Sequence, residues 1–144
     1  MIIPLLQGLK LTLKYFFSGK VTLEYPDKKW DVAERWRGRH LLTKHPSGKI
    51  RCVACMLCAT VCPAQCISIV AAAEPDNRKY PEEYTIDLGR CIFCGYCVEV
   101  CPKEAIEMTT AYEISEYSRE ALILTKEQLL EPPQARYETK KKAG

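Results

Sequence analysis

Two runs of cysteines carry the chemistry that can be read from this 144-residue sequence. Each run has the spacing C-x2-C-x2-C-x3-C-P, a pattern of thiolate ligands that holds [4Fe-4S] clusters. Two residues between ligands let a tight loop bring three thiolates to one cluster. The gap of three sets the fourth thiolate about one helical turn further on, where it serves the other cluster. The spacing therefore predicts a first cluster on Cys52, Cys55, Cys58 and Cys101, and a second on Cys91, Cys94, Cys97 and Cys62.

The two runs belong to an internal repeat of 39 residues. A shift by that distance superimposes the cysteines, the prolines that follow them and the apolar residues of the next strand, with Ile69 on Met108. Each proline is expected to end the short helix before it, because the residue preceding a proline disfavours helical conformation. We expect strands at residues 67–70 and 84–87, paired with each other across a loop at 74–81, and a matching strand at 106–109.

The repeat predicts an α+β protein with the bacterial-type two-cluster ferredoxin fold, a pseudo-twofold β-α-β repeat. Two halves of this size bury little apolar surface, so the clusters must supply much of the core and of the folding free energy.

The ninth cysteine, Cys66, lies outside both runs. The repeat places it opposite Ala105, so we interpret Cys66 as a buried thiol that is neither a cluster ligand nor part of a disulfide. For the runs themselves structural zinc is the alternative, but zinc sites pair their ligands two by two, and four cysteines followed by proline fit that geometry poorly. Disulfides need an oxidising compartment, and the N-terminus shows neither a basic region before its apolar run nor a small-residue cleavage site.

The N-terminal segment predicts an amphipathic helix over residues 2–17, with its apolar residues on one side at 100° per residue. Gly8, Lys10 and Lys14 interrupt the run well short of the ~18 apolar residues that a membrane span needs. Residues 1–51 carry 11 Lys and Arg against 4 Asp and Glu, a net charge of +7. Because the expected core is small, we expect this helix to lie on the bilayer or against a membrane subunit. The alternative is a helix packed on the protein's own core.

A basic segment follows, with Trp30, Trp36 and the three arginines of residues 35–39. Tryptophan and arginine are typical of interface anchors, so the segment indicates a docking surface, with a solvated basic loop as the alternative. No nucleic-acid-binding motif supports a role in nucleic-acid binding. His40 and His45 lack ligand spacing to the cysteines, and we interpret both as surface or interface residues rather than metal ligands.

The chain divides by pattern into three parts. Residues 1–45 are expected to form the amphipathic helix and basic docking arm, residues 46–110 the two-cluster ferredoxin domain, and residues 111–144 a C-terminal arm and tail. Within that arm we expect short helices at 113–120 and 125–130, followed by a charged, solvated tail.

With these motifs in place, the chain resembles the two-cluster ferredoxin-like subunit of respiratory complex I, the proton-translocating NADH:quinone oxidoreductase. The resemblance covers nearly the whole chain and rests on segments outside the ligands as well as on the cysteine runs. These segments are 37–42, 45–48 leading into 52–55, 62–67, 91–97, 115–120 and 125–127.

The resemblance implies that the eight cysteines of the runs hold two [4Fe-4S] clusters and that the subunit relays electrons, with no catalytic residues of its own. It implies partners in the peripheral and membrane arms, no nucleic acid, no homo-oligomer, and a peripheral place on the cytoplasmic side of a bacterial inner membrane. The alternatives are the equivalent subunit of a membrane-bound hydrogenase and a free soluble ferredoxin.

Overall fold

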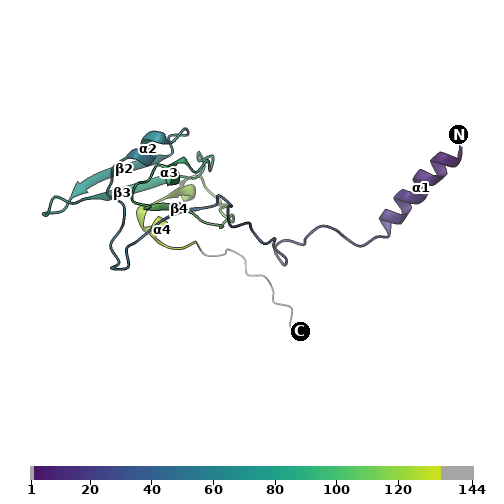
Figure 1. Cartoon of the computed structure of the whole chain (residues 1–144). Coiled ribbons are helices and arrows are strands. Elements are labelled where there is room, and N and C mark those ends of the chain that lie inside the picture. The colour runs from purple at the N-terminus through teal and green to yellow at the C-terminus, as the bar shows by residue number, and fades with distance from the viewer. Residues whose placement is uncertain (1, 134–144) are drawn as a thin grey trace. The chain divides into compact units, whose positions relative to one another are not determined.

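A computed structural model describes residues 2–133. They form two compact units, residues 2–30 and residues 31–133, each of which is described by itself (Figure 1). The charged tail expected near residue 140 lies outside the described residues.

The first unit contains one helix, α1 (Ile2–Phe16), which confirms the helix expected over residues 2–17. Every described residue of α1 is exposed, including the large apolar side chains on its apolar face. Within residues 2–133, no helix has the length and the apolar character needed to cross a membrane.

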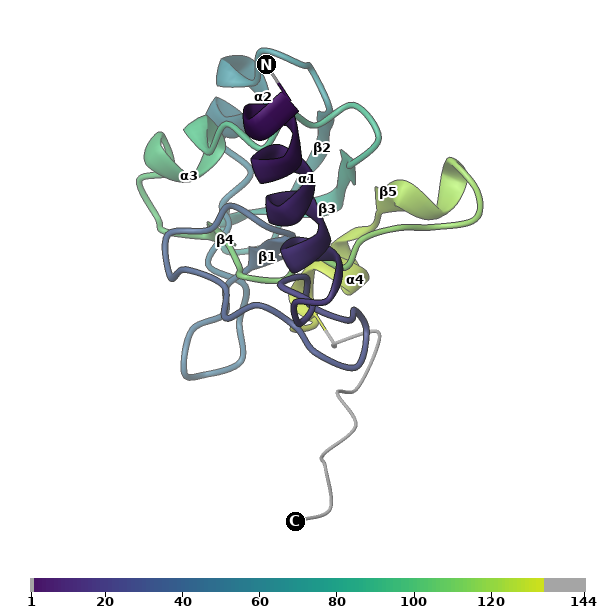
Figure 2. The same ribbon diagram turned by 90° about the vertical axis from the view of Figure 1, so that its right-hand side faces the viewer.

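The second unit is built on two small antiparallel sheets (Figures 1 and 2). In one, β1 (His40–Leu42) pairs with β4 (Ile106–Met108). In the other, β3 (Lys79–Asp87) lies between β2 (Ile67–Ala73) and β5 (Ile123–Leu124). Two short helices, α2 (Leu57–Val61) and α3 (Tyr96–Glu99), pack against each other. The order is therefore strand, helix, strand in each half, and the predicted pairing of residues 67–70 with 84–87 is confirmed.

The backbone of the two cysteine runs repeats at the 39-residue shift. Three residues in or just after the first run adopt the left-handed conformation with positive φ, and so do the three residues 39 positions later. The pairs are Ala54 with Phe93, Met56 with Gly95, and Gln65 with Glu104. Met56 and Gly95 stand directly before α2 and α3, so the same sharp turn starts both helices. α2 ends at Val61, in front of Cys62 and Pro63, as the proline predicts.

The apolar core lies between the sheets, the cysteine loops and the C-terminal segment. Its buried members include Leu42, Ile86, Ile106 and Leu129, together with the sulfur atoms of three cysteines. Leu129 belongs to α4 (Lys126–Leu130), which confirms the helix expected at 125–130. A capping box starts α4, because Thr125 and Gln128 exchange side-chain and backbone hydrogen bonds.

Three sequence-based expectations were wrong. The helix expected at 113–120 does not form, and only one turn of 3-10 helix, η1 (Glu120–Leu122), closes that segment. The loop expected at 74–81 is shorter, because β2 continues to Ala73 and β3 begins at Lys79. His40 is buried in β1 with 2% of its surface exposed, whereas His45 is exposed as expected.

Candidate metal centres

One cavity of the second unit has four cysteines in its wall. They are Cys52, Cys55, Cys58 and Cys101, three from the first run and one from the second. The same wall contains Tyr84 of β3 and Ile106 of β4. The first three sulfurs come from the loop before α2 and from α2 itself, and the fourth comes from the turn after α3.

A second cavity has the reciprocal composition. Cys91, Cys94 and Cys97 come from the second run and Cys62 from the first, and Cys66 and His40 also line it. The sequence pattern places the fourth cysteine of each run beyond a short helix, and α2 and α3 pack against each other. The fourth cysteine of each run therefore lies beside the first three of the other.

The electrostatic neighbours of the thiols follow the same grouping. Burial raises the pKa of Cys52, and the nearby Cys58, Cys101 and Cys55 raise it further. Burial likewise raises the pKa of Cys91, and the nearby Cys62 and Cys94 raise it further. A buried group of thiolates therefore needs compensating positive charge, which iron supplies and water cannot.

Among the eight cysteines of the two runs, Cys97 and Cys58 are the most buried, and they lie on α3 and α2. Burial, followed by the charge of Cys58, raises the pKa of Cys97 to about 12. Burial also raises the pKa of Cys58. Cys62 is the exception, because hydrogen bonds from Cys66 and from two backbone N–H groups outweigh the effect of burial and lower its pKa.

Backbone N–H groups point at sulfur in both halves. The N–H of Ala105 donates to Cys101 Sγ at 3.3 Å, and the N–H of Phe93 donates to Cys91 Sγ at 3.4 Å. The backbone N–H groups 39 positions earlier, those of Cys66 and Ala54, act in the direction that lowers the pKa of Cys62 and of Cys52. These donors stabilise negative charge on sulfur, which is the second-shell support that a cluster requires.

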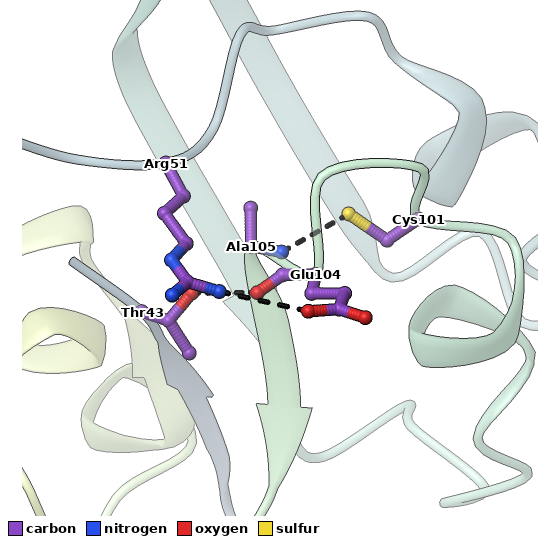
Figure 3. Close-up of polar contacts among 5 residues, drawn as sticks. All are labelled: Thr43, Arg51, Cys101, Glu104 and Ala105. Atoms are coloured by element: carbon purple, nitrogen blue, oxygen red, sulfur yellow. Dashed lines mark hydrogen bonds and ion pairs between the residues drawn. The ribbon is translucent and has the colours of Figure 1, made fainter. Parts of the chain in front are cut away.

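The turn that carries Cys101 is fixed from outside by two polar contacts (Figure 3). Thr43 Oγ1 donates to the carbonyl of Glu104 at 2.6 Å, and Arg51 Nη1 lies 3.7 Å from Glu104 Oε2. Glu104 has positive φ, so these contacts hold a residue whose conformation side chains rarely adopt. The next residue, Ala105, makes the hydrogen bond to Cys101 Sγ.

Arg37 holds the loop of the second run. Its Nη1 donates to the carbonyl of Cys94, and its Nη2 lies 3.7 Å from Glu99 Oε1 on α3. Arg39 Nη2 donates to the carbonyl of Gln128 at 2.6 Å. Two of the three arginines expected on a docking surface, Arg37 and Arg39, therefore also make contacts within the chain, and the docking surface itself stays a prediction.

Cys66 is buried, with 6% of its surface exposed, as expected from its place opposite Ala105. Its Sγ also lies 3.5 Å from Cys62 Sγ, and burial, followed by this contact, raises its pKa. Sequence reasoning missed this proximity. It also missed Tyr84, whose hydroxyl lies 3.3 Å from Cys58 Sγ, and the place of His40 in the wall of the second cavity. Strand register places Tyr84 and His40 at the cavities, and the sequence carries no local sign of these two positions.

The donor set fits iron–sulfur clusters: each cavity is lined by the four cysteines that the sequence assigns to it, with apolar neighbours and N–H donors to sulfur. Among the described residues, no three His, Cys, Asp or Glu side chains converge closely enough to hold a single metal ion.

Comparison with known proteins gives consistent results. Residues 51–115 match the family model described as a 4Fe-4S dicluster domain, and two [4Fe-4S] clusters are accordingly the cofactors of this chain. In the solved structure of the membrane-bound sulfane sulfur reductase, an archaeal respiratory membrane complex, one chain is 33% identical with a TM-score of 0.53. The match covers 76% of this chain and 55% of that one.

Relatives with known names match over nearly the whole sequence. NADH-quinone oxidoreductase subunit I 2 of Geobacter metallireducens is 50% identical over 91% of this chain and 99% of its own length. Subunit I 1 of Geobacter sulfurreducens is 52% identical over 91% of this chain and 98% of its own length. The chain therefore belongs to the NADH-quinone oxidoreductase subunit I family.

Proposed function

We propose that this chain relays single electrons through its two [4Fe-4S] clusters within NADH:quinone oxidoreductase, toward the cluster that reduces quinone. The observation that carries the proposal is the reciprocal grouping of eight cysteines around two adjacent cavities. The chain has no catalytic residue in this proposal, and proton translocation belongs to the whole complex. Its membership of the subunit I family supports the assignment to that complex.

The composition of the two cavities supports the ligand sets that we propose. Cys52, Cys55, Cys58 and Cys101 would hold the first cluster, and Cys91, Cys94, Cys97 and Cys62 the second. When bound, the clusters supply one-electron redox chemistry at potentials set by burial and by hydrogen bonds to sulfur.

The protein contributes three things to this relay. Its loops fix the thiolates, its backbone N–H groups stabilise their negative charge, and its apolar side chains keep water from the sulfurs. The packing of α2 on α3 keeps the two sites next to each other, which short-range electron transfer requires. Pseudo-twofold symmetry of the two halves, supported by the paired positive-φ residues, would give both sites the same framework.

We propose that residues 1–45 attach the chain to the membrane-seated part of the complex, residues 46–110 carry the clusters and residues 111–144 form a C-terminal arm. The exposed apolar face of α1 and the +7 charge of residues 1–51 suit a headgroup surface or an acidic subunit. The partners would be subunits of the peripheral and membrane arms, on the cytoplasmic side of a bacterial inner membrane. Residues 40–42, which belong to the first part, also form strand β1.

Substitution of the crossing ligands tests the ligand sets. Cys62→Ala removes a sulfur from the cavity of Cys91, Cys94 and Cys97, so it is expected to abolish the EPR signal of that cluster and retain the other. Cys101→Ala is expected to do the reverse. Cys66→Ala is the control, and it is expected to leave both clusters in place.

Because Cys66 Sγ lies 3.5 Å from Cys62 Sγ, the double variant Cys62→Ala, Cys66→Ala removes both nearby sulfurs and gives the cleaner test. The assignment fails if Cys62→Ala removes only the cluster bound by Cys52, Cys55 and Cys58. Absence of any iron–sulfur absorption from the loaded wild-type chain would instead favour structural zinc, which metal analysis would detect.

The likeness to a sulfane sulfur reductase chain favours one alternative, a similar relay within another respiratory membrane complex. The donor separates the two functions. In membranes that contain the assembled complex, NADH is expected to reduce both clusters rapidly. If the complex copurifies without NADH-oxidising subunits and NADH leaves both clusters oxidised, the relay serves a different donor.

A further inference from the structure

Two buried polar rings occupy equivalent positions in the two halves of the second unit. In the pairing of β2 with β3, Tyr84 stands opposite Ile69, and in the pairing of β4 with β1, His40 stands opposite Met108. Ile69 and Met108 correspond at the 39-residue shift. The register therefore makes His40 the counterpart of Tyr84, although no local sequence similarity links them.

Tyr84 serves the first cavity. Its side chain is 1% exposed, it lines the cavity of Cys52, Cys55, Cys58 and Cys101, and its hydroxyl lies 3.3 Å from Cys58 Sγ. A thiolate ligand can only accept a hydrogen bond, so in the loaded protein Tyr84 is the donor.

His40 has the matching place at the second cavity. It lines that cavity with Cys62, Cys91, Cys94 and Cys97, and its ring stacks on Phe93, with the centroids 5.8 Å apart. The residue is 2% exposed, and its Nδ1 is one of two buried side-chain nitrogen or oxygen atoms in residues 2–133 that have no hydrogen-bond partner. A buried polar nitrogen without a partner costs free energy, so a hydrogen-bond partner at this cavity would offset the cost of burying Nδ1.

We propose that His40 Nδ1–H donates a hydrogen bond to a sulfur of the second cluster and thereby raises its reduction potential, as Tyr84 does for the first. The proposal rests on the ligand sets proposed above. Reduction adds negative charge to the cluster and its thiolates, and a donor to sulfur stabilises that charge, so the donor favours the reduced state. His40 is a tuning residue in this role, not a ligand.

The test is a redox titration of the full-length cluster-loaded chain, monitored by EPR. The Cys62→Ala and Cys101→Ala variants first assign each EPR signal to its cluster. His40→Phe keeps a buried ring against Phe93 but removes the donor, and it is expected to lower the potential of the second cluster while the first stays at its wild-type value. His40→Tyr returns a hydroxyl of the kind Tyr84 uses and is expected to recover part of the shift. Tyr84→Phe is the mirrored control, expected to lower the potential of the first cluster alone.

Unchanged potentials in His40→Phe would overturn the proposal, as would equal shifts of both clusters, since those indicate a general change of packing. If His40→Phe fails to assemble, the proposal is tested by a second measurement on the His45→Gln variant. In that variant His40 is the remaining histidine. After labelling with ¹⁵N-histidine, pulsed EPR is expected to detect a ¹⁵N coupling on the second cluster, and its absence would also overturn the proposal. Failure of the ligand sets would appear separately, in the cysteine variants.

Discussion

Arg37 connects the N-terminal segment to the second cysteine loop, so its loss is expected to affect one cluster more than the other. Its guanidinium donates to the Cys94 carbonyl and reaches Glu99. Arg37→Ala removes these contacts, and because the side chain is half exposed we expect a loss of about 1 kcal/mol, less than a buried charged donor would contribute. The second cluster should then lose iron faster than the first when a chelator is added.

Arg35→Ala is the matched control for Arg37→Ala, because Arg35 makes no hydrogen bond or ion pair within residues 2–133. It is expected to release iron at the wild-type rate. Equal release rates in Arg37→Ala and Arg35→Ala would show that the contact to the Cys94 loop contributes nothing to cluster retention.

At the scale of single residues, the sequence predicted positions correctly where metal ligation fixes the spacing between ligands. A cubane imposes its geometry on the chain between its ligands, so the positions of the eight cysteines could be predicted to lie together. The buried polar rings could not. Tyr84 and His40 reach the cavities because of how β2 pairs with β3 and β4 with β1, and a register joins residues that are far apart in the sequence.

Among the elements, the pairing of β1 with β4 continues beyond the strands at Gly38, where the two backbones lie close together. The Gly38 N–H donates to the Thr109 carbonyl at 2.8 Å, and a Cβ there would fall on the carbonyls of Ala111 and Thr109. Gly38→Ala must therefore move backbone, and we expect it to lower the free energy of unfolding by about 1–3 kcal/mol.

The thermal midpoint for loss of cluster absorbance, at a fixed heating rate, measures the effect of Gly38→Ala. Gly19→Ala is the control, since nothing lies within 4 Å of its added Cβ. A midpoint for Gly38→Ala equal to that of Gly19→Ala would mean that the strand edge adapts without cost.

Helices and strands were predictable only where a periodic apolar pattern or a motif marked them. α1 has such a mark in its apolar stripe, whereas the capping box of α4 became visible only in the structure. The segment 113–120 has helix-forming residues, but few of them are buried. Without a buried apolar stripe, a short helix does not offset the free-energy cost of its nucleation. β1 is three residues long and exists because β4 pairs with it, so its own sequence could not indicate it.

For the whole molecule, the buried cysteines make the core depend on the clusters. Cys58, Cys66 and Cys97 belong to the same buried group as Leu42, Ile86 and Ile106. Without iron, two of these thiols and their neighbours lose the bonds that draw the halves together, and a core this small is not expected to persist. Removal of iron by a chelator should therefore abolish most of the circular dichroism signal of the sheets, and a cooperative melt in the iron-free chain would contradict this.

The second whole-molecule prediction concerns attachment, which we assign to the apolar face of α1. Leu9 is 66% exposed at the centre of that face, whereas Gln7 lies on the opposite, polar side. Leu9→Glu places a charge in the apolar contact, and Gln7→Glu introduces the same charge where water or headgroups would meet it. No cluster ligand lies in α1, so both variants should retain both EPR signals.

On native gels, Leu9→Glu is expected to weaken retention of the chain in the membrane complex, whereas Gln7→Glu should stay close to wild type. Burial of a leucine contributes about 1.5–3 kcal/mol to binding, which Leu9→Glu removes. A buried unpaired carboxylate weakens binding further. Flotation with vesicles of acidic phospholipid then separates lipid from protein as the contact: if α1 meets lipid, Leu9→Glu also reduces flotation of the isolated chain. Since charge reversal at Arg37 or Arg39 would disturb contacts inside the second unit, α1 is the cleaner place for this test. Loss of clusters in Leu9→Glu with normal assembly would mean that α1 supports the ferredoxin core, and the attachment proposal would be wrong.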